Sequence, residues 1–313
     1  MVRARSASKS SIGCSRRCAR STTCSVTRPR ASPEPPLNRE TRPSRSTRLG
    51  PRCAVVLAGR RSSDDPLAAA AGAPHRALLD IEGEPMLVRV VERLLGWPSI
   101  ERVLINIDTP ELVGAEAAFT TRLASGEIEL LTSTDSPSRS VLESLDAVGL
   151  EAGTILVTTA DHALLDDEIL EAFFRTSEEQ ESDLSFALVP RESIEARFPE
   201  ARRTYLRFRD GDFSGANLFL FRTPESRRAA LFWRRVESQR KHPWQIARAF
   251  GLMNLLLFAT RQLELDSALA RASKVIDAQV TAIRIGIAEA AVDVDKIEDL
   301  ELVRRVLAER HGS

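Results

Sequence analysis

The sequence predicts an α/β fold with a Rossmann-like, three-layer α/β/α arrangement around a mostly parallel mixed sheet. Three observations support this prediction. From residue 53 onward, short apolar segments alternate with segments of helical periodicity. The apolar segments are almost continuous, which is typical of parallel strands that helices cover on both faces. Further along, Asp210-Gly211 separates two apolar segments, which indicates a hairpin and therefore some antiparallel strands.

The first half of the α/β region is the more regular part. The run Cys53–Leu57 (CAVVL) ends at Ala58-Gly59 and predicts a short buried strand. Apolar residues recur at helical spacing from Met86 to Leu95, which predicts the first long helix. The predicted elements are strand 53–57, helix 85–97, strand 102–107, helix 111–124, strand 127–131, helix 138–149, strand 154–159 and helix 166–180.

The second half predicts strands and helices in a less regular order. A long helical stretch separates the hairpin from the last strands, so the block from about 233 to 278 is predicted to be a helical insertion. The predicted elements are strands 184–189, 205–208 and 213–221, helices 224–240 and 243–278, strands 281–285 and 291–294, and helix 296–311.

The net charge of zero conceals two parts of opposite charge. Residues 1–50 hold twelve basic and two acidic side chains, giving +10, and the remaining 263 residues hold 32 basic and 42 acidic ones, giving −10. The first part has almost no aliphatic run, so we expect a disordered basic tail over 1–50 and one domain over 51–313. The acidic charge of that domain argues against nucleic acid as a partner.

Three interpretations of the basic tail remain open. Its composition fits a transit peptide, although it lacks an apolar stripe and its prolines would break a helix. Its charge fits a tether to nucleic acid or to a membrane surface. The plainest interpretation is a solvated extension, or a start codon placed too far upstream. Cys14, Cys18 and Cys24 in the tail lack the spacing of a zinc site.

The composition of the whole chain limits its class and its location. With 28% charged and 43% hydrophobic residues, it is typical of a soluble globular protein, not of collagen, a coiled coil or a disulfide-rich mini-protein. The domain has a single cysteine, Cys53, which suits a reducing compartment, so we expect a cytoplasmic protein. No run of 18 apolar residues occurs, and therefore no transmembrane helix is predicted.

Cations follow the first predicted strand. In open α/β sheets, ligands bind outside the carboxyl ends of the strands, so the residues at those ends are the candidates for a site. After Leu57 and Ala58, Gly59 permits close approach of the backbone to a ligand, and the cations Arg60 and Arg61 follow directly. Arg76 is a third cation that could fold back over the same place. Anion binding is the functional interpretation of this loop, and a structural turn is the alternative.

Carboxylates follow two later predicted strands. Asp161 comes directly after strand 154–159, where it is well placed to hold Mg²⁺, while Asp166 is the better cap for the next helix. Neighbouring His162 is expected to be a polar loop residue, not a ligand. Alternation along 291–294 places Asp293 and Asp295 on one face. If Asp295 caps the last helix, Asp293 is the better candidate for the metal.

Taken in order, several motifs resemble the MobA-like nucleotidyltransferase family. They are Leu57-Ala58-Gly59, the Arg76-Ala77-Leu78-Leu79 segment with Gly83-Glu84-Pro85-Met86-Leu87, the Thr159-Ala160-Asp161 turn, and Asp293 to Leu300. The likeness covers about residues 53–222 and 280–311. It implies a GT-A-like domain that joins an NTP to a phosphorylated small-molecule acceptor and releases pyrophosphate with Mg²⁺.

The resemblance also implies roles for single residues. It implies that the turn Leu57 to Gly59 receives the nucleotide. It also implies that Arg76 occupies the position of a phosphate-binding Lys and that Asp161 is the metal-binding Asp. It further implies that Ser138 and Ser140 lie near the base, and that Gly215 and Asn217 line the acceptor side. The chain departs from the family pattern at Arg60, which replaces a Gly, at Asp64, which replaces an Arg, and at Arg76.

Two other functions stay open at this point. One is a GT-A-type glycosyltransferase that uses a nucleotide sugar, although Asp161-His162-Ala163 lacks the second acid of its usual metal motif. The other is a non-catalytic nucleotide-binding protein on the same fold. The block 233–278 mixes aromatic and basic residues, so it predicts a helical cap or, alternatively, a peripheral membrane contact. The acceptor and the oligomeric state are not identified by the sequence.

Overall fold

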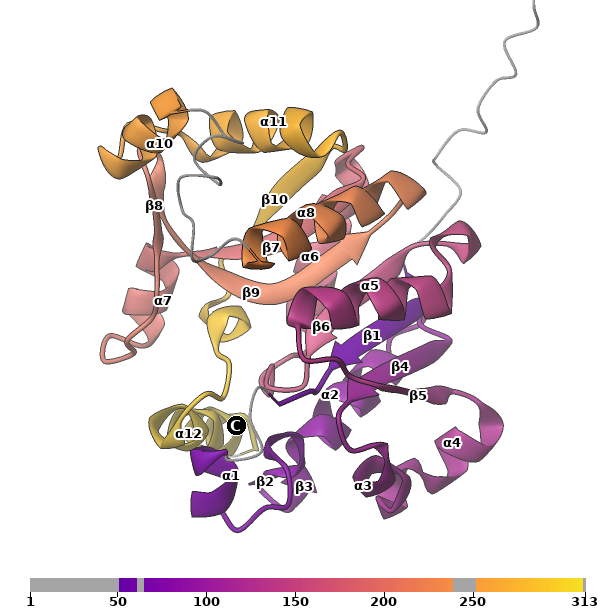
Figure 1. Cartoon of the computed structure of the whole chain (residues 1–313). Coiled ribbons are helices and arrows are strands. Elements are labelled where there is room, and N and C mark those ends of the chain that lie inside the picture. Colours follow the sequence, from indigo (N-terminus) through magenta and orange to yellow (C-terminus); the bar gives the residue numbers. More distant parts are fainter. Residues whose placement is uncertain (1–50, 61–64, 239–251, 312–313) are drawn as a thin grey trace, which may run out of the picture. The chain divides into compact units, whose positions relative to one another are not determined.

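The fold is built on one mixed sheet, which contains eight strands among the described residues (Figure 1). The computed structural model describes residues 51–60, 65–238 and 252–311, which belong to one compact unit. The predicted basic tail 1–50, Arg61 and Asp64 lie outside the described residues. The strands are β1 (Cys53–Leu57), β4 (Arg102–Ile107), β5 (Ile128–Thr132), β6 (Ile155–Thr159), β7 (Leu184–Pro190), β8 (Leu206–Phe208), β9 (Gly211–Phe221) and β10 (Val280–Arg284).

The order of the strands explains the sequence pattern. Along the sheet they follow β10, β7, β9, β6, β1, β4 and β5, and β8 pairs with β9 alone. The pairs β1–β4, β1–β6, β4–β5 and β7–β10 are parallel. The hairpin strand β9 is antiparallel to β6, β7 and β8. The predicted α/β fold with a mostly parallel mixed sheet is therefore confirmed.

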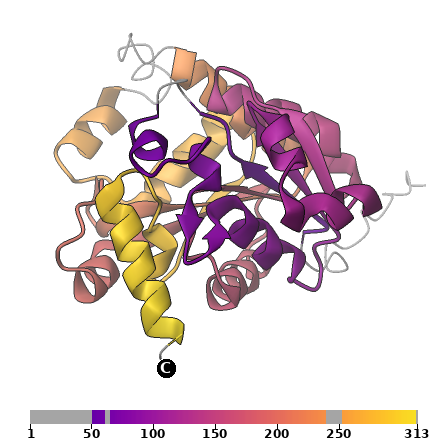
Figure 2. The ribbon, with the colours of Figure 1, turned by 90° about the horizontal axis from the view of Figure 1, so that it is seen from below.

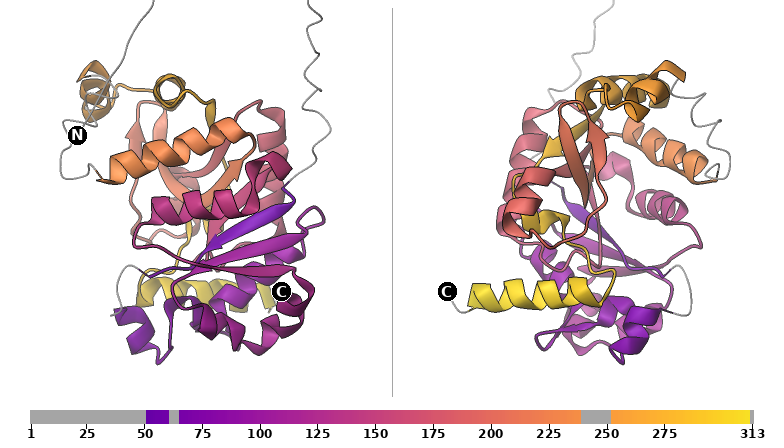
Figure 3. Two further views of the ribbon diagram at one scale, coloured as in Figure 1. Left: turned by 45° about the vertical axis from the view of Figure 1, so that its right-hand side comes forward. Right: turned by 90° about the vertical axis from the view of Figure 1, so that its left-hand side faces the viewer.

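Helices cover both faces of this sheet. The long helices are α2 (Met86–Leu95), α5 (Pro137–Val148), α6 (Asp167–Glu179), α8 (Arg227–Ser238), α11 (Leu265–Ile276) and α12 (Ile297–His311). On one face, α2 and α6 pack against alternate residues of β1 and β4, including Val56 and Ile105. On the other face, α5 and α8 pack against the intervening residues, including Val55 and Leu104. Figure 3 shows α5 and α8 side by side.

A smaller core joins the two ends of the described chain. The short helix α1 (Pro66–Ala70), the hairpin β2 (Asp80–Ile81) and β3 (Glu84–Pro85), and α12 bury Leu67, Ile81 and Val303 against one another. Figure 2 shows the yellow helix α12 beside this indigo segment. The packing matters for function because it brings residues 292–296 next to the loop that follows β6.

The predicted helix 111–124 is wrong as a single element. The chain forms α3 (Pro110–Gly114), a 3₁₀ turn (Ala117–Phe119) and α4 (Thr120–Ser125). Val113 and Phe119 are both fully buried in the same core. They are six residues apart, which a continuous helix would place about 120° apart around its axis. The break allows both side chains to be buried on one side.

Two more predicted elements of the second half are wrong. The described part of predicted helix 243–278 forms two helices, α10 (Leu252–Ala259) and α11. Between them, Arg261 has a left-handed φ of 56°, which a continuous helix does not allow. Residues 291–294 form no strand, because Ala291 ends the 3₁₀ turn η6 (Ala288–Ala291) and the residues after it pair with no strand of the sheet. Val292 and Val294 are buried against the smaller core, not in the sheet. Helix α7 (Arg191–Arg197) was not predicted, because it starts directly at the end of β7.

Candidate functional site

The loops after β1, β4 and β6 lie next to one another at the carboxyl edge of the sheet. The Ala58 amide donates to the Asn106 carbonyl at 2.8 Å, and the Ala160 amide donates to the Leu57 carbonyl at 2.9 Å. These bonds extend the register of the three strands by one residue into their loops. The Leu57-Ala58-Gly59 turn and the Asp161 turn, which the sequence assigned to one site, are therefore neighbours.

Gly59 lies against the loop that follows β5. A Cβ atom placed on Gly59 would meet Ser133 Oγ at 2.6 Å and Ser133 Cβ at 2.9 Å. No side chain fits there without displacement of one of the two loops. The glycine is therefore required by its close contact with the Ser133 side chain, whereas the predicted approach of its backbone to a ligand stays a prediction.

Replacement of Gly59 by Ala is expected to lower the free energy of unfolding by about 1–3 kcal/mol, because it overpacks the contact with Ser133. Chemical denaturation of the full chain measures this change. The double variant Gly59→Ala/Ser133→Gly removes both clashing atoms, so it should recover most of the loss. If the double variant is no more stable than Gly59→Ala alone, the contact is not the reason for the glycine.

Arg60 is tied to the loop after β4. Its amide donates to Asp108 Oδ1 at 3.1 Å, and its Nε donates to Asp108 Oδ2 at 2.8 Å. His75 Nε2 lies 3.0 Å from Asp108 Oδ1. Burial alone would raise the pKa of Asp108, but the hydrogen bonds from His75 and Arg60 lower it below its usual value. The carboxylate is therefore ionised and fully paired.

Arg76 faces the carboxylates of the site. Its Nε donates to Asp65 Oδ2 at 2.7 Å, and its Nη1 donates to Asp295 Oδ1 at 2.9 Å. Burial alone would lower the pKa of Arg76, but the carboxylates around it raise that pKa above its usual value. Asp161 is one of these carboxylates, so Arg76 and Asp161 lie within electrostatic reach of each other.

Asp161 lies in the turn after β6 and carries an unpaired buried atom. Its Oδ1 is buried and has no hydrogen-bond partner among the described residues. Burial raises the pKa of Asp161 to about 6, and the neighbouring carboxylates of Asp293 and Asp295 add to this shift. A buried carboxylate oxygen without a donor, next to other carboxylates, is a position that a bound cation would stabilise.

Asp293 is brought to Asp161 by the backbone of the following residue. The Val294 amide donates to the Asp161 carbonyl at 3.1 Å, which places the segment 292–295 alongside the turn. Burial raises the pKa of Asp293, and the guanidinium of Arg203 acts in the opposite direction. Asp161 and Asp293 are thus brought together, which their separation of 132 residues in the sequence did not establish.

The pair fits Mg²⁺ better than a metal that needs a complete protein cage. Across the described ranges, no group of three or more His, Cys, Asp or Glu side chains could hold a metal ion. Mg²⁺ usually takes one or two carboxylates and completes its shell with water and substrate phosphates. The orphaned oxygen of Asp161 and the neighbouring carboxylate of Asp293 fit that requirement.

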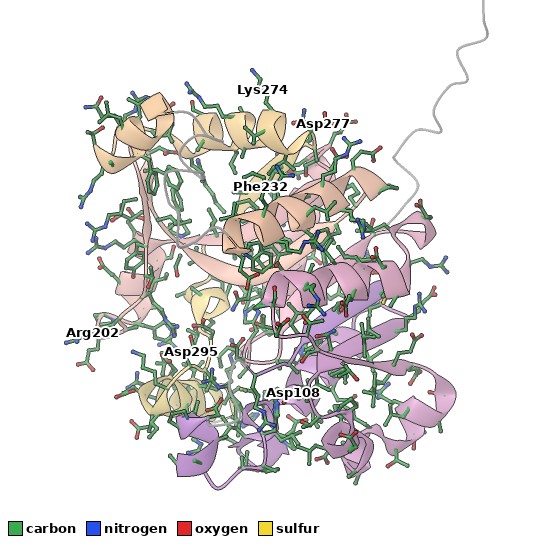
Figure 4. All side chains as sticks on the ribbon, in the orientation of Figure 1. Asp108, Arg202, Phe232, Lys274, Asp277 and Asp295 are labelled. Carbon is green, nitrogen blue, oxygen red and sulfur yellow. The ribbon has the colours of Figure 1, made fainter. Side chains whose placement is uncertain are left out.

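Asp295, which the sequence left as a possible cap of the last helix, does not cap α12. The side chain of Asp299 accepts hydrogen bonds from the amides of Asp295 and Lys296, both at 3.2 Å, and so caps α12. Asp295 instead points its carboxylate to Arg76, as described above. Arg203 pairs with both Asp293 and Asp299, and its side chain is only 9% exposed. Figure 4 shows Asp108 and Asp295 on the side of the sheet where α1 and α12 lie.

Ser138 and Ser140 lie in the first turn of α5, and both are buried. Ser140 Oγ accepts a hydrogen bond from the Thr134 amide at 2.9 Å, which shapes the loop between β5 and α5. Ser138 Oγ lies 3.0 Å from Ser136 Oγ, and its amide donates to Glu237 of α8 at 3.3 Å. The two serines therefore organise the start of α5 beside the loop that contacts Gly59.

Gly215 and Asn217 lie in an irregular part of β9. The register with β7 moves from Phe186 opposite Phe219 to Leu188 opposite Gly215, so β9 holds two extra residues between these pairs. Asn217 has a left-handed φ of 49° there. Pairing of β9 with β6 ends at Val157, just before the Asp161 turn. A bulge of this kind often redirects a side chain next to a functional site.

Other buried polar atoms gather at the same edge. Within the described part of the chain, hydrogen-bond partners are missing for both amide atoms of Asn106 and for the hydroxyls of Ser133, Thr158 and Thr159. These residues lie at the carboxyl ends of β4, β5 and β6. Orphaned polar groups are rare in folded proteins, so their concentration here indicates a place for water or ligand. His162 is buried in this loop, and burial lowers its pKa to about 4.

Four residues of the site were missed at the level of sequence. Asp108, His75, Asp65 and Arg203 complete the networks around Arg60, Arg76 and Asp293. Asp108 follows strand 102–107 directly, so the same rule of strand ends would have identified it. For His75, Asp65 and Arg203 no motif or spacing gives a signal, because their partners are distant in the chain.

The helical block carries exposed apolar side chains. Trp233, Leu256 and Phe258 are 41%, 55% and 37% exposed. None of the described helices combines the length and the apolar character needed to span a bilayer. Residues 239–251 of the block lie outside the described residues, and its contact with a membrane surface stays a prediction.

Comparison with known proteins shows the family to which the chain belongs. The family described as "MobA-like NTP transferase domain" matches residues 54–274. A solved structure of a hypothetical transferase from Thermus thermophilus is 31% identical, with a TM-score of 0.65, and the match covers 80% of this chain and 100% of that one.

Two relatives share the same described activity, 3-deoxy-manno-octulosonate cytidylyltransferase. The protein from Yersinia enterocolitica serotype O:8 / biotype 1B is 28% identical over 249 residues, which is 75% of this chain and 92% of that enzyme. The protein from Chlorobium limicola is 26% identical over 155 residues, which is 48% of this chain and 58% of that enzyme. The chain thus spans little more than half the length of the second relative.

Proposed function

Because the chain belongs to the MobA-like NTP transferase family, we propose that it transfers a nucleoside monophosphate from an NTP to a phosphorylated small-molecule acceptor. The reaction would release pyrophosphate and depend on Mg²⁺. The observation that carries this proposal is the place of Asp161 among the carboxylates of Asp293 and Asp295 and the guanidinium of Arg76, which itself contacts Asp295 at 2.9 Å. A polyphosphate with a divalent cation needs cations and carboxylates side by side.

The geometry supports a division of roles between the residues. The turn Leu57 to Gly59 would receive the nucleotide through its backbone, and the side chains of Arg60 and Arg76 would neutralise the phosphates that leave. Arg76 is oriented for this by Asp65 and Asp295, one on each side of its guanidinium. Ser138 and Ser140 shape the adjoining loop, and Gly215 and Asn217 would face the acceptor.

The transfer itself needs positioning more than covalent chemistry by the protein. An acceptor phosphate oxygen would attack the α-phosphorus while the bond from that phosphorus to the bridging oxygen breaks, and the β- and γ-phosphates depart as pyrophosphate. Mg²⁺ held by Asp161 and Asp293 would supply neutralisation of the charge at the α-phosphate. The acceptor phosphate is already ionised, so no side chain is needed as a general base.

The test is a panel assay with the full chain. Each NTP is incubated with Mg²⁺ and with phosphorylated sugars, phosphorylated alcohols and an octulosonate, and pyrophosphate is measured. CTP is the first nucleotide to try, since both relatives are described as cytidylyltransferases. We expect acceptor-dependent pyrophosphate release with at least one NTP and one phosphorylated acceptor, and release with the octulosonate alone would contradict the phosphorylated acceptor. Nucleotide binding without turnover across the panel would favour the binding-protein alternative and contradict the proposal.

A further inference from the structure

We infer that Asp108 and His75 are positioning residues that hold the segment Ala58–Arg60, which follows β1, in the conformation that receives the NTP phosphates. This inference rests on the proposed function and adds to it a specific pair of residues. Neither residue belongs to a motif that the sequence pointed to. Asp108 lies after β4, and His75 lies before the 3₁₀ turn Arg76–Leu78. Both His75 and Arg60 form hydrogen bonds with the Asp108 carboxylate.

The carboxylate of Asp108 lies beside the residues that follow β1. β1 and β4 are adjacent parallel strands, with Leu57 opposite Asn106. Arg60 follows the first strand by three residues and Asp108 follows the second directly. Asp108 accepts both the backbone amide and the Nε of Arg60, so it fixes the path of the loop and the direction of the side chain.

The side chain of His75 is only 1% exposed. Its Nδ1 accepts a hydrogen bond from the Ala77 amide at 3.0 Å, so that nitrogen carries no proton. The proton of a neutral ring is then on Nε2, which donates to Asp108 Oδ1 at 3.0 Å. His75 is thus a buried donor with one orientation, and it holds the Asp108 carboxylate in place. The Asp108 carboxylate in turn holds Arg60.

A carboxylate beside a phosphate site repels the ligand, so its presence needs a compensating role. The guanidinium of Arg60 balances its charge, while the Arg60 amide and the neutral His75 donate further hydrogen bonds to it. The Nη groups of Arg60, which form no hydrogen bond with another described residue, and the guanidinium of Arg76 are then the proposed donors for phosphate on this side. Gly59 fixes the same loop from the other side through its contact with Ser133.

The energetic consequence is preorganisation. A loop that is already ordered loses less conformational entropy when a ligand binds, so a loop that has been freed binds the ligand less tightly. In the variant Asp108→Asn one acceptor oxygen becomes an NH₂ group, which faces donors. We therefore expect its dissociation constant for NTP to rise by about ten-fold and the inhibition constant of pyrophosphate to rise in parallel.

The chain provides a matched control for this variant. Arg52 and Glu101 form a pair of 2.6 Å that also joins β1 to β4, but at the amino ends of the strands. Their side chains are 66% and 61% exposed, so this pair contributes little. Glu101→Gln should leave NTP binding unchanged. If Asp108→Asn acted through general loosening of the two strands, both variants would show the same effect.

The experiment has two arms that fail separately. In the first, hydrogen exchange of the peptide that contains Ala58–Arg60 is measured without nucleotide, and Asp108→Asn should exchange faster than wild type and Glu101→Gln. Unchanged exchange overturns the inference, whatever the enzyme does. In the second, nucleotide affinity is measured by calorimetry, and turnover at saturating NTP should fall less than affinity does. Equal or tighter NTP binding by Asp108→Asn overturns the inference, whereas no binding by wild type overturns the proposed function.

His75→Ala supplies a second variant, should Asp108→Asn fold poorly. It should weaken NTP binding by about five-fold, because it removes the donor that orients the carboxylate. In the double variant with Asp108→Asn, the two effects should not add, since they act through one network. Additive effects would contradict the assignment of His75 to the same network.

Discussion

Replacement of Asp161 by Asn is expected to reduce pyrophosphate release by about a thousand-fold, which corresponds to about 4 kcal/mol of transition-state stabilisation. The amide keeps the size of the side chain but removes the charge that would hold the metal. The buried Oδ1, which has no partner among the described residues, is the atom through which we expect this loss. Initial rates at several Mg²⁺ concentrations measure the effect.

The control for this variant is Asp135→Asn, which also changes an aspartate in a loop after a strand. The Asp135 side chain is 86% exposed and pairs only with Arg139 among the described residues. Its activity should equal that of wild type. A second readout is Mn²⁺ binding, followed by electron paramagnetic resonance without substrate, which Asp161→Asn should weaken. Wild-type rates from Asp161→Asn would remove Asp161 from the site.

Replacement of Arg76 by Ala is expected to reduce kcat/KM for the NTP by about a hundred-fold. The guanidinium is the cation that lies among Asp65, Asp295 and Asp161, so its loss also leaves these carboxylates without compensation. Arg76→Lys keeps one charge but only one of the two oriented contacts, so it should recover part of the loss. Steady-state kinetics with varied NTP measures both variants.

Arg93→Ala is the matched control for the Arg76 variants. Arg93 also pairs with an aspartate, Asp167, at 3.0 Å, but it lies on α2 and is 43% exposed. Its kinetic constants should not change. If Arg76→Ala lowers the free energy of unfolding but leaves kcat/KM intact, Arg76 is a structural residue that links α1 to α12.

The strands of the sheet were predictable because their burial on both faces dictates their composition. Strand 102–107 was predicted with the bounds that β4 has, since five of its six residues are fully buried. The same argument misled at 291–294, where Val292 and Val294 alternate like a strand. Their partners are α12 and α1, which lie far away in the sequence, so local pattern did not distinguish the two kinds of burial.

The helices were predicted less well where their ends depend on tertiary contacts. The break in 111–124 follows from the need to bury both Val113 and Phe119 in one core. The break after α10 lies at Arg261, which adopts a left-handed φ. No Gly or Pro stands at that position, so the sequence gives no sign of the break. Propensity alone does not locate such breaks, because the burial that favours them comes from other elements.

The site was predictable only in outline. The rule that ligands bind at the carboxyl ends of strands located Gly59 and Asp161, and the structure places their loops side by side. The sequence left open whether Asp295 caps the last helix, and in the structure Asp299 accepts the hydrogen bonds of that cap. The hydrogen bonds that link Arg60 to His75, or Asp293 to Arg203, join segments whose proximity the chain order does not reveal.

One measurement tests the central claim most directly. An NTP labelled at the α-phosphate is incubated with the full chain, Mg²⁺ and the acceptor found in the panel assay. The predicted result is transfer of the label to the acceptor, with an equal amount of pyrophosphate and with loss of both in Asp161→Asn. Label that remains on free nucleoside mono- or diphosphate would contradict the assignment of nucleotidyl transfer to this site. Sugar transfer to the acceptor, when a nucleotide sugar replaces the NTP in this assay, would contradict it as well.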